Sequence, residues 1–206
     1  MKTCIFSPFF WKKNVSETGN IQSKYLKSIF HNYEELPNLS PDWNVHTSYG
    51  QEDRLPEKLD WNYSLNIYET YIDSFLEDFF QTIPRYKISG TPWYTAYGPG
   101  QGANIHEHLP DHFSIVHFLK FNPKVHWPIT FINPNNNSTK ILLDSEPSIK
   151  NRINFDDSEQ SYFHPRFTPN LEEGDLIIFP SQLEHMVEKT TSEELRISIA
   201  FNIKLF

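Results

Sequence analysis

The alternation of residues 195–203 constrains the fold more than any other stretch of the chain. Leucine, isoleucine and phenylalanine occupy every second position, and Arg196, Ser198, Ala200 and Asn202 stand between them. Alternate residues of a strand point to opposite faces, so one face is apolar and the other carries an arginine, a hydroxyl and an amide. Such a polar face is often solvated, but inside a closed or doubled sheet it requires a polar ligand.

Histidine spacing indicates a candidate metal site. His106 and His108 are two residues apart near an expected strand end, and His185 follows far along the chain. Residues two apart in a strand share a face, so both imidazoles of the pair can reach one ion. Each histidine alone is at least as often a surface residue as a ligand. Three imidazoles on one side of a metal suit iron(II) and leave open positions for other ligands.

Two helices followed by a series of strands are expected along the chain. Residues 20–33 and 64–82 repeat apolar side chains at helical spacing, and Asn20 is a candidate N-cap of the first helix. Strand patterns fall in residues 3–11, 86–88, 93–97, 113–121, 128–132, 176–179 and 195–203. We predict a mainly β fold with flanking helices (α+β), whose core is a double-stranded β-helix, or jelly roll.

The predicted organisation is one domain over residues 1–206. In it, residues 1–85 supply an N-terminal strand and supporting helices, and residues 86–206 form the jelly-roll core. Residues 134–161 lack clear periodicity and are interpreted either as a lid over the site or as a surface insertion. A homodimer through the N-terminal helices is an expectation that no particular motif specifies.

Composition argues against several classes of protein. The net charge is −8, from 26 acidic and 18 basic residues, and no basic stretch is typical of a nucleic-acid-binding surface. No apolar run approaches the length of a membrane span, and no signal peptide is recognisable. Cys4 is the single cysteine, which is compatible with a reducing compartment, so we expect a cytoplasmic protein.

Several short motifs occur in a characteristic order. A Tyr-Gly-Pro-Gly-Gln turn, residues 97–101, precedes the histidine pair, and Glu-Gly-Asp-Leu-Ile-Ile-Phe-Pro-Ser, residues 173–181, precedes His185. Arg196, Ile197 and Ser198 follow. Taken together, these motifs resemble the iron(II)- and 2-oxoglutarate-dependent oxygenases, specifically the prolyl-4-hydroxylase-like branch and its small bacterial and phage relatives. The resemblance covers roughly residues 90–206.

The resemblance implies a set of site residues. It implies iron(II) bound by His106, His108 and His185, with 2-oxoglutarate and O₂ as co-substrates. Arg196 would hold the distal carboxylate of 2-oxoglutarate, assisted by Ser198, and these histidines and the arginine would form the catalytic set. Tyr97, Asn202 and His117 are further candidates for contact with the co-substrate. His117 stands on an otherwise apolar strand face, where a hydrogen-bonded core histidine is the competing interpretation.

One position departs from the pattern of the resembled family. That pattern is His-x-Asp or His-x-Glu, and here His108 stands at the acidic position. Asp111 is the alternative ligand, if residues 109–110 turn the chain back, and Glu107 ranks below it because an ideal strand points it away. A metal other than iron is also compatible with three histidines.

The predicted function is hydroxylation of an unidentified substrate, with succinate and CO₂ as co-products. A peptidyl proline, an amino acid or a small metabolite is compatible with the resemblance. Two alternatives remain. One is a cupin-type three-histidine dioxygenase that does not use 2-oxoglutarate and therefore has no need of Arg196. The other is a non-catalytic jelly-roll module whose metal site is structural.

Overall fold

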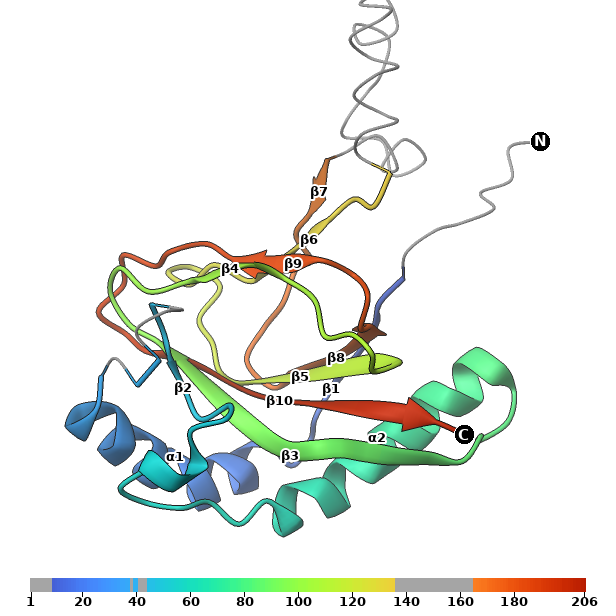
Figure 1. The fold of residues 1–206 in the computed structure, drawn as a ribbon, viewed down its shortest axis with the longest axis horizontal. Coiled ribbons are helices and arrows are strands. Elements are labelled where there is room, and N and C mark those ends of the chain that lie inside the picture. The colour runs from blue at the N-terminus through green and yellow to red at the C-terminus, as the bar shows by residue number, and fades with distance from the viewer. Residues whose placement is uncertain (1–8, 38, 41–43, 136–164) are drawn as a thin grey trace, which may run out of the picture.

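The computed structural model describes residues 9–37, 39–40, 44–135 and 165–206. Two helices cover one face of a six-stranded sheet, and a four-stranded sheet lies over the opposite face (Figure 1). The predicted mainly β fold with flanking helices is therefore confirmed. Neither described helix combines the length and the apolar character needed to cross a bilayer.

The strands of both sheets pair in antiparallel fashion. The larger sheet has the order β1-β8-β5-β10-β3-β2 and the smaller sheet β4-β9-β6-β7. The larger sheet contains β1 (Trp11–Asn14), β2 (His46–Thr47), β3 (Tyr86–Tyr97), β5 (Phe113–Lys120), β8 (Asp175–Pro180) and β10 (Arg196–Leu205). The smaller sheet contains β4 (Ala103–His106), β6 (Ile129–Ile132), β7 (Arg166–Phe167) and β9 (His185–Val187).

The helices are α1 (Thr18–Glu35) and α2 (Asn62–Phe80), with a short 3₁₀ helix, η2 (Glu52–Arg54), between them. Both predicted helices are confirmed, each with its apolar stripe in the core. The expected N-cap is wrong, because α1 begins two residues before Asn20 and Glu17 occupies the cap position without a side-chain hydrogen bond. The hydroxyl of Thr18 instead donates to the carbonyl of Val15 at 2.6 Å.

Two strand predictions need correction. Within the described residues the N-terminal strand is Trp11–Asn14, beginning where the predicted strand 3–11 ends, and residues 1–8 lie outside the described part of the chain. It joins the edge of the larger sheet by pairing with β8. The expected break between residues 88 and 93 is instead an irregularity within β3, where the pairing moves from Trp93↔Ala200 to Ser89↔Asn202. Gly90 lies in this irregularity at φ 75°, a backbone conformation that glycine adopts at little steric cost.

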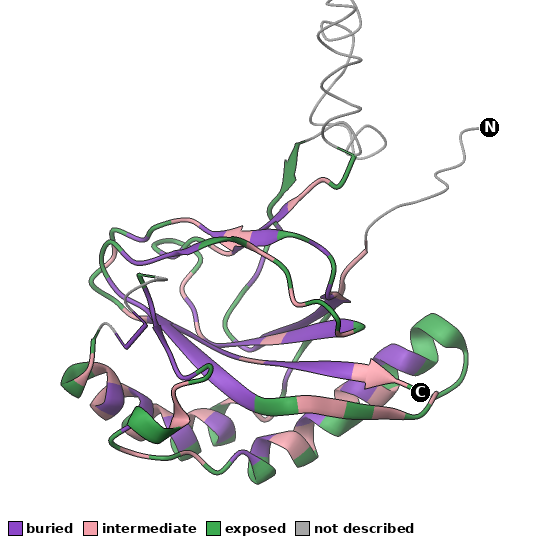
Figure 2. Ribbon diagram, in the orientation of Figure 1, coloured by how far each residue is buried: buried purple, intermediate pink, exposed green. Residues whose placement is uncertain are grey.

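Two apolar layers lie on either side of the larger sheet. One packs α1 and α2 against the outer face and includes Ile199 and Phe201 of β10. The other fills the space between the sheets and includes Phe118, Ile177 and Phe179. Figure 2 shows the central strands buried along most of their length. Because Ile199 and Phe201 face the helices, Arg196 and Ser198 face the interior between the sheets.

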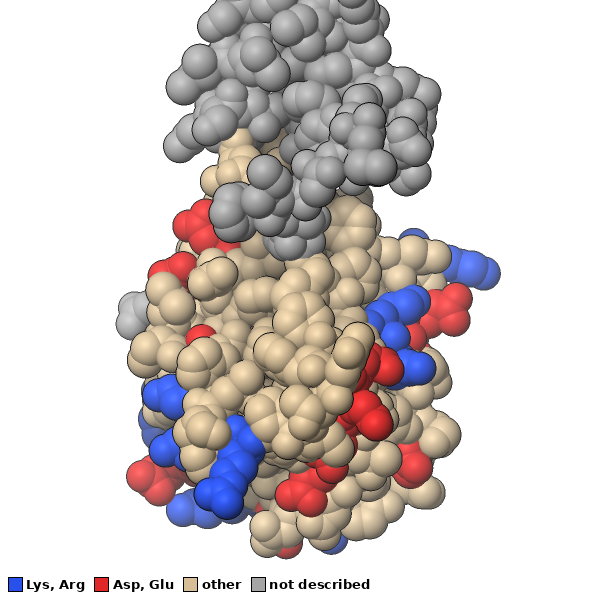
Figure 3. Space-filling model, turned by 90° about the vertical axis from the view of Figure 1, so that its right-hand side faces the viewer, with Lys and Arg blue, Asp and Glu red and all other residues tan. Residues whose placement is uncertain are grey.

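Charged side chains are distributed without a basic patch on the face shown in Figure 3, which displays the right-hand side of Figure 1. Lysine, arginine, aspartate and glutamate are mixed there around a broad uncharged area. The predicted lid, residues 134–161, falls almost wholly outside the described residues.

Candidate metal centre

Three histidines from two strands and a turn meet between the sheets. His106 ends β4, His185 begins β9, and the two residues pair directly in the smaller sheet. His108 follows two residues later, where its backbone N–H donates to the carbonyl of Ser181 at 2.8 Å. One ligand atom from each of the three imidazoles lies within 4.8 Å of the others. The geometry therefore allows a single metal ion to be bound by all three side chains.

Hydrogen bonds orient two of these rings. Nδ1 of His106 lies 2.7 Å from the carbonyl oxygen of Asn104, and Nδ1 of His185 lies 2.8 Å from that of Leu183. A carbonyl oxygen only accepts, so Nδ1 carries the proton in both rings and Nε2 is left unprotonated. This is the arrangement that metal-binding histidines usually have, with one nitrogen fixed by a hydrogen bond and the other available to the ion.

The three imidazoles are neutral at neutral pH. Burial lowers the pKa of His106 and of His185. Burial also lowers the pKa of His108 to about 4, with a further contribution from the charge of His106 and an opposing one from Asp111. A histidine must be deprotonated to bind a metal, so the site is already in its metal-binding form and releases no proton from these rings on binding.

The alternative acidic ligand does not join this group. Asp111 Oδ2 accepts a hydrogen bond from the side-chain amide of Asn202 at 3.0 Å, and Oδ1 lies 3.5 Å from Lys204 Nζ. Among the described residues, the metal-competent group around His108 consists of histidines alone. Glu107 is exposed. The geometry thus favours His108 over Asp111 as the third ligand.

Arg196 is the main charged group of the interior. It is 2 % exposed, and its Nε and Nη1 have no hydrogen-bond partner among the residues that the structure describes. Its guanidinium carbon lies 4.7 Å from the ring centre of Tyr97 and 5.2 Å from that of Phe118. Aromatic faces attract the cation but do not satisfy its N–H donors. A buried guanidinium with two N–H-bearing nitrogens that no described residue satisfies fits an anionic ligand with a carboxylate group.

The inner face of the larger sheet includes two residues that are only half-buried. Ala200 and Val116 pair directly in adjacent central strands, yet both are only half-buried. Their side chains alternate with residues that face the helices, and Val116 packs against the apolar layer between the sheets. Ser198 precedes Ala200 on this face and is buried. Trp93 pairs with Ala200, and its ring lies 5.7 Å from that of His108.

Two predicted co-substrate contacts are not where the sequence analysis expected them. His117 is on the opposite face of β5, where Tyr68 and Thr18 lie 2.8 and 3.0 Å from its ring nitrogens. The predicted contact of His117 with the co-substrate is wrong. The competing interpretation, a hydrogen-bonded core histidine, is confirmed. Asn202 is six residues beyond Arg196 on β10, about 20 Å at the rise of a strand. It therefore cannot bind the same carboxylate as Arg196.

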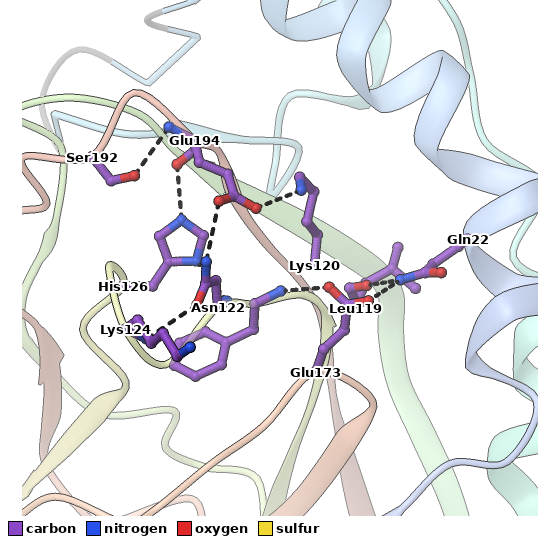
Figure 4. Close-up of polar contacts among 10 residues, drawn as sticks. Gln22, Leu119, Lys120, Asn122, Lys124, His126, Glu173, Ser192 and Glu194 are labelled. Atoms are coloured by element: carbon purple, nitrogen blue, oxygen red, sulfur yellow. Dashed lines mark hydrogen bonds and ion pairs between the residues drawn. The ribbon is translucent and has the colours of Figure 1, made fainter.

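A polar network fixes the chain on its way into β10 (Figure 4). His126 Nδ1 accepts the backbone N–H of Asn122 at 3.0 Å, so its Nε2 carries the proton and donates to the carbonyl of Glu194 at 2.9 Å. The carboxylate of Glu194 accepts from Lys120 at 2.8 Å and from Asn122 at 3.4 Å. Since Glu194 is two residues before Arg196, this network positions the arginine. Sequence reasoning missed it because the partners are far apart along the chain.

Gln22 extends the same network to α1. Its side-chain amide donates to the carbonyl of Leu119 at 2.7 Å and to Glu173 at 2.9 Å. Glu173 in turn accepts the backbone N–H of Phe121 at 3.1 Å. The end of β5 next to Arg196 is therefore held from the helix layer as well as from the loop before β10 (Figure 4).

The donor set fits the metal and co-substrate that the resemblance implies. Three neutral imidazoles are suitable ligands for iron(II), and the unpaired guanidinium of Arg196 is suited to a dicarboxylate. Ser198 shares the inner face of β10 with Arg196, and the ring of Tyr97 lies against the guanidinium.

Comparison with known proteins agrees with this chemistry. The family described as "Putative 2OG-Fe(II) oxygenase" matches residues 91–202. A search of curated proteins finds no match. Several solved structures share the fold at low sequence identity, which confirms the predicted double-stranded β-helix.

Three of these structures illustrate the likeness. A prolyl-4-hydroxylase from Pseudomonas putida is 10% identical, with a TM-score of 0.57 over 97% of this chain and 94% of the other. A viral collagen prolyl hydroxylase from Paramecium Bursaria Chlorella virus-1 is 12% identical, with a TM-score of 0.53 over 96% of each chain. AviO1 from Streptomyces viridochromogenes is 9% identical, with a TM-score of 0.60 over 96% of this chain and 90% of the other.

Proposed function

Because this chain belongs to the 2OG-Fe(II) oxygenase family, we propose that it hydroxylates a carbon of a small-molecule or peptide substrate. The reaction consumes 2-oxoglutarate and O₂ and releases succinate and CO₂, with one oxygen atom entering the substrate and the other succinate. The observation that supports this proposal most strongly is the buried Arg196, whose Nε and Nη1 have no partner among the described residues and which faces the interior between the sheets, as the three histidines do.

Each site residue has a role in this proposal. His106, His108 and His185 hold the iron(II), which supplies the oxidation chemistry when it is bound. Arg196 binds the distal carboxylate of 2-oxoglutarate through two N–H donors, and Ser198 donates a further hydrogen bond from the same strand face. The rings of Tyr97 and Phe118 flank the guanidinium and hold it in place. Phe131 and Phe179, which lie close to His185, exclude water from that side of the metal.

The substrate is proposed only as a class. Solved structures that share the fold include prolyl hydroxylases and also a carbocyclase, SnoK, which is 12% identical with a TM-score of 0.57. One fold therefore hosts more than one reaction and substrate. The proposed classes are a peptidyl proline, a free amino acid and a small metabolite.

Within the described residues the histidine group includes no carboxylate, which favours a second candidate function. A three-histidine dioxygenase that does not use 2-oxoglutarate would have the same metal ligands. Such an enzyme has no use for Arg196, and an unpaired buried arginine would then be a cost without a function. For this reason we place the 2-oxoglutarate-dependent reaction first.

Anaerobic titration with iron(II) and then with 2-oxoglutarate tests the proposal. We expect a weak visible charge-transfer band that saturates with 2-oxoglutarate. His106→Ala and His185→Ala should abolish the band by removing metal ligands. Arg196→Met should raise the 2-oxoglutarate concentration needed for half-saturation by roughly a hundredfold. Arg166→Met is the matched control, since Arg166 is exposed and ion-paired with Glu188.

The outcomes separate the candidate functions. Iron binding without a 2-oxoglutarate-dependent band would favour the three-histidine dioxygenase. If the protein binds no iron(II) at all, the oxygenase proposal fails and a structural metal or binding role takes its place.

A further inference from the structure

Two buried oxygen atoms near the far end of β10 lack hydrogen-bond donors. They are Oδ1 of Asp111 and Oδ1 of Asn202, and no described residue donates a hydrogen bond to either atom. The amide of Asn202 donates to Oδ2 of Asp111 at 3.0 Å. A carboxylate at neutral pH only accepts, so this contact fixes the amide orientation and turns its oxygen away from Asp111. Asn202 is 6 % exposed, so bulk water does not readily replace the missing donor.

Lys204 is the nearest cation to this pair. Its ammonium lies 3.5 Å from Oδ1 of Asp111, which makes an ion pair but not a hydrogen bond. The lysine side chain is 35 % exposed and can turn into solvent. The two oxygens therefore form an acceptor pair that accepts no hydrogen bond from any described residue. A ligand with hydrogen-bond donors would satisfy it.

The acceptor pair is connected to the metal centre by a short series of contacts. The backbone N–H of Asp111 donates to the carbonyl of His108 at 3.1 Å. Asn202 pairs with Ser114 on β5, and the Ser114 hydroxyl lies 2.9 Å from that of Ser181. Ser181 in turn accepts the N–H of His108. The pair thus lies beside His108, at the opposite end of β10 from Arg196.

A half-buried alanine and an aromatic side chain lie near the pair. Ala200 precedes Asn202 on the inner face of β10 and is half-buried together with Val116. Trp93 pairs with Ala200 and lies against His108. A ligand group above Ala200 would therefore have the indole on one side and the acceptor pair on another. An indole face attracts cationic groups, and two oxygen acceptors bind N–H donors.

We propose that Asp111 and Asn202 form a substrate subsite that binds a nitrogen-borne hydrogen-bond donor beside the metal. The donor is an N–H of either a free amino group or a peptide amide, and both sources share the same chemistry. This inference rests on the proposed function and specifies the substrate class for it. The interior then has two distinct ends: Arg196 receives the dicarboxylate, and Asp111 and Asn202 receive the nitrogen of the substrate.

A ligand panel tests the subsite in the full chain loaded with Mn(II) and 2-oxoglutarate without oxygen. The panel contains free L-amino acids, their N-acetyl methylamides and the matching 2-hydroxy acids, which lack the nitrogen. We expect members with nitrogen to bind at least about tenfold more tightly than their hydroxy-acid matches, measured by calorimetry. Binding by free amino acids identifies an amine substrate, and binding by the methylamides identifies a peptide.

Variants assign this binding to the acceptor pair. Asp111→Asn should weaken binding of the nitrogen-containing ligands by about tenfold or more, because the new amide can donate to Asn202 and the negative charge is lost. Asn202→Ser removes the free amide oxygen and should also weaken binding of the nitrogen-containing ligands. It is the second test of the subsite if Asp111→Asn does not fold. Glu107→Gln removes the same charge from an exposed position of the same segment and should leave binding unchanged.

Three results would overturn the subsite. One is that no panel member binds although the protein shows the charge-transfer band with iron(II) and 2-oxoglutarate. This result would contradict the subsite but not the proposed function. Another is that hydroxy acids bind as tightly as their nitrogen-containing matches. The last is that Asp111→Asn releases the metal without changing panel binding, which makes Asp111 a metal ligand. Loss of the band in the unaltered protein would instead contradict the proposed function itself.

Discussion

At the scale of single residues, the interior combines neutral metal-binding groups with Arg196, a cation that no described residue neutralises by an ion pair. The histidines are kept neutral by burial, whereas arginine stays charged under all ordinary conditions. Arg196 has aromatic rings but no described carboxylate beside it. The protein without co-substrate therefore carries an electrostatic cost that ligand binding removes.

Replacing Arg196 with methionine should have opposite effects on stability and on binding. The variant removes the unpaired charge and keeps most of the apolar volume, so the free energy of unfolding without ligand should rise by ~1–3 kcal/mol. Urea denaturation of the metal-free protein measures this. Arg166→Met, at an exposed position, should change stability little. A destabilised Arg196→Met protein would mean that the guanidinium serves the fold rather than a ligand.

The sequence predicted the chemistry of single residues better than their placement. His106, His108, His185 and Arg196 followed from residue type and two-residue spacing, and the structure brings the histidines together. Alternation assigns the residues of a strand to two faces but does not show which face lies between the two sheets. His117 was misassigned for this reason, because its face packs on the helices.

At the scale of elements, the metal centre depends on the close pairing of β4 with β9. Gly102 immediately precedes β4, and a Cβ atom there would lie 2.7 Å from the carbonyl oxygen of Val187 and 3.0 Å from the backbone nitrogen of Lys189. Both contacts are with backbone atoms, which cannot rotate away. Any side chain at residue 102 therefore separates the strands that carry His106 and His185.

We accordingly expect Gly102→Ala to weaken both folding and metal binding. The clash should lower the free energy of unfolding by ~1–3 kcal/mol, and metal affinity should fall because the two histidines move apart. Thermal denaturation and competition with a metal chelator measure the two effects. Gly19→Ala is the matched control, since a Cβ at that helical position meets no atom within 4 Å. Equal metal affinity in Gly102→Ala and the unaltered protein would contradict the role of this pairing.

His117 joins both helices to the larger sheet, and its hydrogen bonds require the neutral ring. The Thr18 hydroxyl donates to Val15, so it accepts from His117 Nε2, and Nδ1 then accepts from the Tyr68 hydroxyl. Burial lowers the pKa of His117 to about 3, below the value of about 6.5 in an unfolded chain. The unfolded state therefore binds the proton first as the pH falls.

The pH dependence of stability should reflect this residue. The contribution of His117 is fully present above about pH 6.5 and is lost as the pH falls toward 3, by about 1.4 kcal/mol per pH unit. Denaturation of the metal-free protein across this range should show a shallower slope in His117→Gln than in the unaltered protein. His31→Gln, at a half-buried position of α1, is the matched control and should keep the original slope. An unchanged slope in His117→Gln would assign the acid sensitivity to other groups.

Element boundaries and long-range pairing were the least predictable features. Periodicity predicted the helices and most strands. The extra residues in β3 were instead predicted to separate two strands, because glycine and proline, here Gly90 and Pro92, usually end strands. The pairing of His106 with His185 depends on two sheets folding over each other. No local pattern specifies that register, so the site geometry required the structure.

At the scale of the whole molecule, the candidate site joins the two sheets. His106 and His185 belong to the smaller sheet, whereas Arg196 and Ser198 belong to the larger sheet (Figure 1). A metal held by the histidines and a co-substrate held between that metal and Arg196 would connect the sheets across the interior. Ligand binding should therefore stabilise the smaller sheet more than the helix layer, which packs on the opposite face.

This arrangement predicts a stepwise gain in stability. Mn(II) at about one hundred times its Kd should add ~2.7 kcal/mol to the free energy of unfolding, and 2-oxoglutarate at a similar excess should add about the same again. Hydrogen exchange should slow in β4 and β9 with the metal and further with the co-substrate. In Arg196→Met only the first step should remain, because the metal ligands are intact. If both steps persist in that variant, Arg196 does not hold the co-substrate. If exchange slows only in α1 and α2, the ligands bind outside the space between the sheets.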